Sequence, residues 1–182
     1  MALPAYLKRT LGTPIIWGEA GATTVFGAVT NTLSLDALVK ATARMGAYAD
    51  LGAAFPEKSL LFSVAETGTA PTAGYSVDVH LAWSPVSSAF PGGVTGSDGA
   101  WPSDGNEDEW APQIGHRAGS LVATNDANTV QIQGPFIIIN RCRYVAPVYD
   151  NNLDQDLRNE TTASDNTSCI AIYPIIDSIE DS

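Results

Sequence analysis

The chain has 182 residues, of which 45 % are hydrophobic and 8 % aromatic, so it is long enough for one domain with a buried core. Nine Lys and Arg residues stand against twenty Asp and Glu, and the net charge of −11 argues against direct binding to a phosphate backbone. No run of about 18 apolar residues is present, and the N-terminal residues form no continuous apolar segment, so we expect neither a membrane span nor a cleaved secretory signal.

The N-terminal segment, residues 1–22, combines apolar side chains with prolines and glycines that interrupt any regular element. We predict an irregular arm that docks either on a neighbouring subunit or on its own domain. Residues 23–182 are predicted to form one domain. The arm residues expected to make the contact are Leu3, Tyr6, Leu7, Leu11 and Trp17.

Three segments follow before the middle of the chain. Residues 23–33 are rich in β-branched side chains and indicate a strand. Residues 35–44 are ambiguous between helix and strand, and we favour strand. Residues 59–66 indicate a strand with Leu60, Phe62 and Val64 on one face.

The segment 75–83 (YSVDVHLAW) alternates apolar and polar side chains with a period of two. This pattern is typical of a half-buried strand, which belongs to an antiparallel sheet and not to a parallel sheet buried on both faces. The longest predicted loop follows at 84–116, and a second polar loop is expected at 150–167. Further strands are predicted at residues 120–124, 129–133, 136–139, 143–149 and 169–176.

About eight strands with long connections predict an all-β fold, an antiparallel β-sandwich of jelly-roll type with an irregular N-terminal arm. Cys142 and Cys169 lie in apolar stretches and are interpreted as free buried thiols, although a disulfide is geometrically possible if their strands pair.

No catalytic or metal-binding motif is complete. Residues 104–108 and 150–154 begin like EF-hand loops, but the glycine and glutamate that such loops require later are missing, so we assign no metal and no cofactor. His80 and His116 lack partners at zinc-ligand spacing. Trp101 and Trp110 flank an acidic stretch, an arrangement that also occurs in sugar-binding clefts.

Several strand-and-turn segments occur in a characteristic order along the chain. They are residues 67–74 (TGTAPTAG), 77–84 (VDVHLAWS), 91–98 (PGGVTGSD), 119–122 (GSLV), 143–147 (RYVAP) and 173–177 (YPIID). In this order they resemble small structural proteins of tailed bacteriophages, which are often encoded among the head genes. The resemblance covers roughly residues 30–180, and the chain departs from the pattern at 104–109, where the acidic stretch is unusually dense.

The resemblance implies a non-enzymatic capsid decoration or cement protein that binds the major capsid protein shell. It implies location on the capsid surface of a virion assembled in the bacterial cytoplasm, and no catalytic residues. We expect a homo-oligomer, with a trimer preferred because capsids offer threefold positions. The alternative is a carbohydrate-binding module on a phage tail that uses Trp101 and Trp110, and a hydrolase is a remote third hypothesis.

Overall fold

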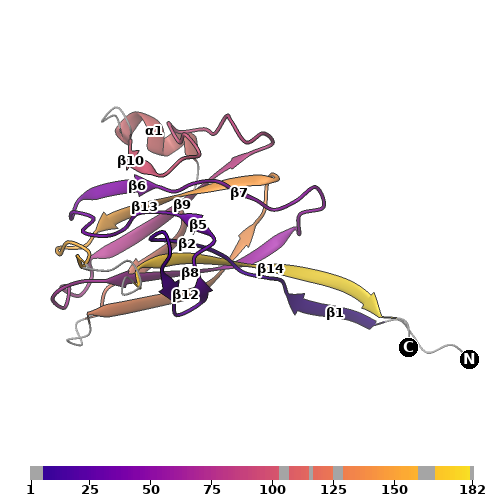
Figure 1. Ribbon diagram of the computed structural model, residues 1–182, viewed down its shortest axis with the longest axis horizontal. Coiled ribbons are helices and arrows are strands. Elements are labelled where there is room, and N and C mark those ends of the chain that lie inside the picture. Colours follow the sequence, from indigo (N-terminus) through magenta and orange to yellow (C-terminus); the bar gives the residue numbers. More distant parts are fainter. Residues whose placement is uncertain (1–5, 103–106, 115–116, 125–128, 160–166, 181–182) are drawn as a thin grey trace, which may run out of the picture.

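The computed structural model describes residues 6–102, 107–114, 117–124, 129–159 and 167–180. Strands dominate these residues, and one short helix, α1 (Glu107–Ile114), accompanies them (Figure 1). The strands are β1 (Tyr6–Leu11), β2 (Ile15–Gly18), β3 (Thr23–Thr24), β4 (Gly27–Ala28), β5 (Asn31–Thr32), β6 (Thr42–Met45), β7 (Ala49–Asp50), β8 (Lys58–Glu66), β9 (Ser76–Ser84), β10 (Gly99–Trp101), β11 (Arg117–Val122), β12 (Val130–Ile139), β13 (Tyr144–Asn152) and β14 (Cys169–Glu180). No helix in this part of the chain is long and apolar enough to cross a membrane.

The strands form two large sheets that pack face to face. The β14 sheet has the order β12-β8-β14-β2-β5, with β1 also paired to β14, and the β13 sheet has the order β10-β6-β13-β9-β11, with β7 also paired to β13. Consecutive main strands are distributed over the two sheets so that β2, β14, β8 and β12 face β6, β13, β9 and β11. This is the connectivity of a jelly roll. The predicted all-β sandwich is therefore confirmed.

The main core lies between the sheets and follows the predicted period of two. Val77, Val79 and Leu81 of β9 are buried, whereas Ser76 and His80 on the opposite face are partly exposed. The β14 sheet contributes buried side chains from β2, β8 and β14 to the same core, namely Trp17, Leu61, Ala65, Ile170 and Ile172.

Two polar groups in this core find main-chain acceptors. The hydroxyl of Tyr149, on β13, donates a hydrogen bond to the carbonyl oxygen of Val64 on β8 at 3.0 Å, and so links the two sheets. The indole N–H of Trp17 donates to the carbonyl oxygen of Ala47 at 2.6 Å. Large side chains with a polar tip are stable inside a core only when that tip is paired, as it is here.

The structure corrects two sequence-based predictions. Residues 6–18 are not an irregular arm, because they form β1 and β2, both paired to β14. Their partners on β14 lie more than a hundred and fifty positions away in the chain, so local prolines and glycines did not reveal them. Residues 84–116 are not entirely loop, since β10 and α1 lie within them.

The inter-sheet hydrogen bond of Tyr149 yields a stability prediction. Tyr149→Phe removes the donor and leaves the ring in place, so the free energy of unfolding should fall by about 1 kcal/mol. Urea denaturation of the variant measures this loss. Tyr75→Phe is the matched control, because Tyr75 is 48 % exposed and its replacement should leave the midpoint unchanged. Equal midpoints for Tyr149→Phe and the parent chain would contradict the assignment.

Candidate interaction surface

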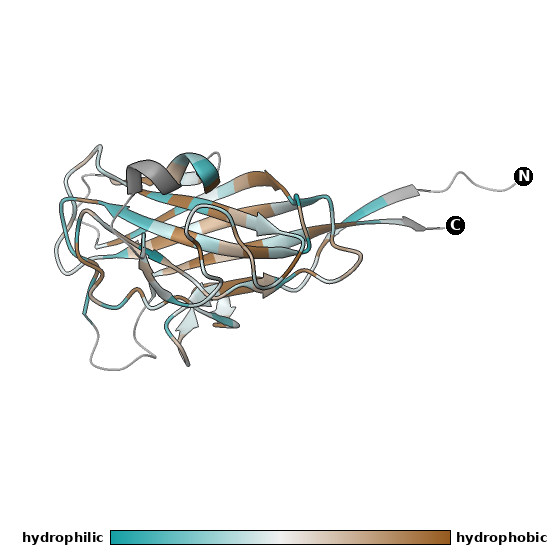
Figure 2. Ribbon diagram, turned by 90° about the horizontal axis from the view of Figure 1, so that it is seen from above, coloured by the Kyte–Doolittle hydropathy of each residue, from teal (hydrophilic) through white to brown (hydrophobic). Residues whose placement is uncertain are grey.

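A two-stranded ribbon projects from one end of the sandwich. It consists of β1 and the end of β14, paired in register from Leu11↔Ile175 to Tyr6↔Glu180. Two views at right angles show it extending beyond the body of the sandwich (Figures 1 and 2). The pairing of β8 with β14 ends at Ile175, so within the described residues the ribbon has an open backbone edge on each side.

The ribbon carries a central ion pair and apolar side chains at its base. Arg9 Nε donates to Asp177 Oδ1 at 2.9 Å, with both side chains largely exposed. Next to it, Leu11 is 56 % exposed and Ile176 is 45 % exposed. An exposed ion pair contributes little to stability or binding. The ribbon would therefore bind a partner mainly through its solvent-exposed apolar side chains.

The base of the ribbon opens into a groove of about 760 Å³. One wall comes from the segment between β7 and β8, and the other comes from β12 and β14. The apolar side chains that line it are Leu51, Pro56, Ile137, Pro174, Ile175 and Ile176.

The outer face of the β14 sheet continues this apolar surface across four strands. Directly paired residues of antiparallel strands point to the same face, and two such rows are apolar here apart from one lysine. In the first row, Ile137 pairs with Leu60 and Leu60 with Tyr173. In the second row, Ile139 pairs with Lys58, Lys58 with Ile175 and Ile175 with Leu11. We call Leu11, Leu60, Ile137, Ile139, Tyr173 and Ile175 the apolar strip.

The exposure of the apolar strip is greatest on the edge strand β12. Ile137 is 72 % exposed and Ile139 is 61 % exposed, whereas Ile138 between them points into the main core and is 7 % exposed. The sequence contained a signal for this that was missed. Three consecutive isoleucines in a strand cannot all face one core, so the outer two had to lie on the other face.

The structure places the predicted interaction residues in different environments. Leu11 is exposed at the base of the ribbon. Leu3 lies outside the described residues, and Tyr6, Leu7 and Trp110 lie in β1 or α1 with side chains outside the described part.

Two tryptophans of the predicted surface are buried and present no contact to a partner, and Trp17 instead docks on its own domain, the second of the two arrangements expected for residues 1–22. Trp17 is 0 % exposed in the main core. Trp101 is 3 % exposed in a second core on the outer face of the β13 sheet, and its indole N–H donates to the carbonyl oxygen of Gly92 at 2.7 Å. Trp101 therefore anchors the segment that covers this sheet, and its ring has no free face for a sugar.

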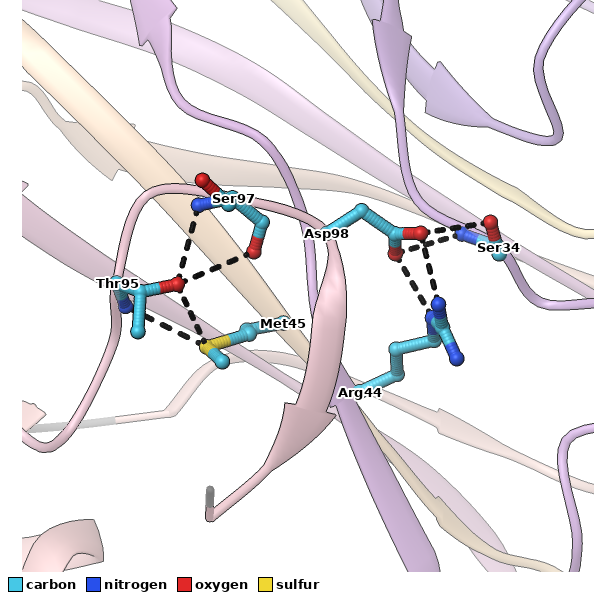
Figure 3. Close-up of polar contacts among 6 residues, drawn as sticks. All are labelled: Ser34, Arg44, Met45, Thr95, Ser97 and Asp98. Atoms are coloured by element: carbon cyan, nitrogen blue, oxygen red, sulfur yellow. Dashed lines mark hydrogen bonds and ion pairs between the residues drawn. The ribbon is translucent and has the colours of Figure 1, made fainter.

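An ion pair holds that covering segment in place (Figure 3). Asp98 accepts hydrogen bonds from Arg44 Nε at 2.7 Å and Nη2 at 2.8 Å, and from the backbone N–H and hydroxyl of Ser34 at 3.0 and 2.7 Å. Burial alone would raise the pKa of Asp98, but these four hydrogen bonds outweigh it and the pKa lies below its usual value.

A pair of carboxylates lies on the outer face of the β13 sheet. Asp78 on β9 and Asp150 on β13 are directly paired in register. Asp78 accepts from Arg117 Nη1 and Ser120 Oγ, each at 2.6 Å, while Asp150 accepts from Asn152 Nδ2 at 2.8 Å. Burial raises the pKa of Asp150 and the nearby Asp78 raises it further, against the opposing hydrogen bond from Asn152. On the same face, the ring of His80 stacks on Trp101 with centroids 6.5 Å apart.

In residues 150–154, the second segment that begins like an EF-hand loop, polar side chains bond to neighbouring segments of the chain. Asn151 Nδ2 donates to the carbonyl oxygens of Leu38 and Gln155, and Asp154 Oδ1 accepts from the backbone N–H of Thr72 at 2.9 Å. The residues of 150–154 thus serve to tie neighbouring segments together. Residues 104–106 of the first such loop lie outside the described part, as do the side chains of 107 and 108.

The two cysteines are free thiols in the structure. Cys142 is half-buried, and Cys169 lies buried in the cluster on the outer face of the β14 sheet. Burial raises the pKa of Cys169 to about 12. A thiol held in its neutral form is a poor nucleophile, so Cys169 acts as a packing residue.

Comparison with known proteins leaves the chain without an assigned relative. No family model matches it, no curated protein matches it and no solved structure matches it.

The low pKa of Asp98 predicts acid sensitivity of the covering segment. A carboxylate with a lowered pKa in the folded state stabilises the fold above its unfolded pKa, about 3.9, and loses this contribution as the pH falls through the folded value. Asp98→Asn should therefore lower the free energy of unfolding at pH 7 by about 2 kcal/mol, with the difference shrinking below about pH 4. Denaturation at several pH values measures it. Asp177→Asn, in the exposed pair with Arg9, should show no such loss, and equal effects of the two variants would refute the assignment.

The raised pKa of Asp150 predicts that its negative charge destabilises the fold, which is the opposite of the effect at Asp98. The folded state binds the proton more tightly than the unfolded state, so the ionised carboxylate costs stability at neutral pH. Asp150→Asn should raise the melting temperature at pH 7 by about 2 °C, and the gain should vanish below about pH 4. Asp78→Asn is the control and should lower the melting temperature, because it weakens the hydrogen bonds from Arg117 and Ser120. A lower melting temperature for Asp150→Asn at pH 7 would show that its charge is favourable.

Proposed function

We propose that the protein is a structural subunit of a bacteriophage virion, a decoration or cement protein that binds the shell of the major capsid protein. In this proposal it lies on the capsid surface as an oligomer, with a trimer preferred. The resemblance of its strand-and-turn segments to small phage head proteins supports the proposal. The jelly roll accords with it, since double-sheet jelly rolls occur in viral capsid proteins.

The observation that carries the proposal is the projecting ribbon. The sandwich closes its own core without the ribbon, because the main core draws on β2, β8 and the first part of β14 and on none of the described side chains of β1. Open strand edges and exposed apolar side chains are the features through which a strand binds another protein. A ribbon that reaches beyond the body with both features is suited to holding the body against a surface.

The alternative is a carbohydrate-binding tail module, for which Trp101 and Trp110 were the proposed aromatic contacts, and Trp101 cannot serve as one. Stacking on a sugar requires an accessible ring face, and Trp101 is buried and bonded to Gly92. No other observation in the described residues favours this alternative over the decoration protein.

Copy number tests the proposed function. A decoration protein occupies repeated positions on the shell, so purified virions should contain hundreds of copies, in fixed ratio to the major capsid protein. Quantitative mass spectrometry of virions from cells that produce the protein measures the ratio. A handful of copies per particle would refute the decoration role, and binding of the purified protein to host glycans would then favour the tail module.

A further inference from the structure

We propose that the apolar strip is the surface on which a second copy of this chain packs. The inference rests on the proposed structural role for its biological setting, and it names the partner of the surface. Its physical basis is the grouping of exposed apolar side chains at one end of the molecule. Leu11, Ile137 and Ile139 are each more than half exposed and belong to rows paired across the same sheet.

The chain leaves the outer face uncovered at the strip. Elsewhere on this face, Phe26 packs on Phe62 with ring centroids 5.3 Å apart, and Phe62 packs on Tyr173 at 5.8 Å. This cluster also covers Val64, Cys169 and Ala171. The cover ends at Tyr173, and the sheet beyond it presents its isoleucines to solvent. Contiguous apolar patches of this kind mark interaction sites on soluble proteins.

The distribution of charge favours a second copy as the occupant. The chain carries a net charge of −11, whereas the charged side chains around the strip nearly balance, because Arg9, Lys58 and Arg141 stand against Glu57 and Asp177. Lys58 lies within its second row, Arg9 lies beside Leu11 in the ribbon, and Arg141 lines a depression together with Ile137 and Ile139. The acidic excess therefore lies outside the strip. Two acidic copies therefore repel each other least at the strip, and Lys58 and Arg141 can attract acidic groups on the rest of an identical chain.

The backbone edges of the ribbon add a second means of attachment. The outer edge of β1 is open, and β14 beyond Ile175 is open on the side away from β1 in the described residues. At the other end of β12 the situation differs, because glutamine side chains bridge the edges of β11 and β12. Gln133 Oε1 accepts from the backbone N–H of Val122 at 2.7 Å, and Gln131 Oε1 accepts from that of Thr124 at 3.2 Å. Among the described residues, the strip end thus combines exposed apolar side chains with open strand edges.

The experiment measures self-association of the purified full-length chain by sedimentation velocity over a range of concentrations. Ile137→Asp and Ile139→Asp place a charge on the strip without disturbing the core, because both side chains are exposed. Ile132→Asp is the matched control, since Ile132 lies on the same strand, is 55 % exposed and is not part of the strip. Circular dichroism and thermal melting confirm that each variant is folded.

We expect the parent chain and Ile132→Asp to form the same oligomer, and the two strip variants to associate at least about tenfold more weakly, a loss of about 1.4 kcal/mol. Lys58→Glu should weaken association at low salt and less so at high salt, because screening removes its attraction to an acidic partner. A parent chain that stays monomeric up to roughly 100 µM, or strip variants that associate like the control, would overturn the inference.

Binding to capsids separates this inference from the proposed function. If the parent chain is monomeric in solution but binds capsid shells through Ile137 and Ile139, the occupant is the shell protein, so the inference fails while the proposed function stands. If the strip drives oligomer formation but virions contain only a handful of copies, the inference stands and the decoration role fails.

Discussion

The continuity of β14 is the constraint on which the architecture depends. Its first residues, Cys169–Ile172, pair with β8 on one side and β2 on the other and are buried, whereas its last residues pair with β1 outside the body. The change of partner occurs at Pro174, which has no N–H to donate and whose carbonyl oxygen accepts from the N–H of Gly12 at 2.8 Å. A side chain at position 12 would approach Ile176 Cδ1 to 3.0 Å, so glycine permits the close crossing between β1 and β2.

The two outer faces of the sandwich are covered to different extents. On the β13 sheet, α1 and the segment pinned by Asp98 pack over Met45, Ala82 and Val148 and bury Trp101. On the β14 sheet, the aromatic cluster around Phe62 covers the part from β2 to Val130 of β12 and leaves the ribbon end uncovered. The long connection between β9 and β11 thus covers the outer face of the β13 sheet, whereas the base of the ribbon on the β14 sheet stays exposed. This asymmetry is what confines a candidate contact to one end of the molecule.

Charge reinforces the same division. An acidic surface keeps copies soluble and apart, which suits a protein that must not associate at random. Positive side chains near the strip lower that repulsion at one place. The pKa values of two carboxylates depend on their surroundings. The partly buried Asp98, paired with Arg44, has a lowered pKa, whereas the buried Asp150, opposite Asp78, has a raised pKa.

The sequence by itself determined the all-β class and the main strands, because a period of two in segments such as 75–83 and 59–66 requires one face of a sheet to be buried. It also determined that Ile137 and Ile138 face opposite sides of the sheet. Only the tertiary structure decided the course of residues 6–18, whose backbone partners on β14 are remote in sequence. It likewise decided the burial of Trp17 and Trp101, because the exposure of a large side chain depends on which distant segment covers it.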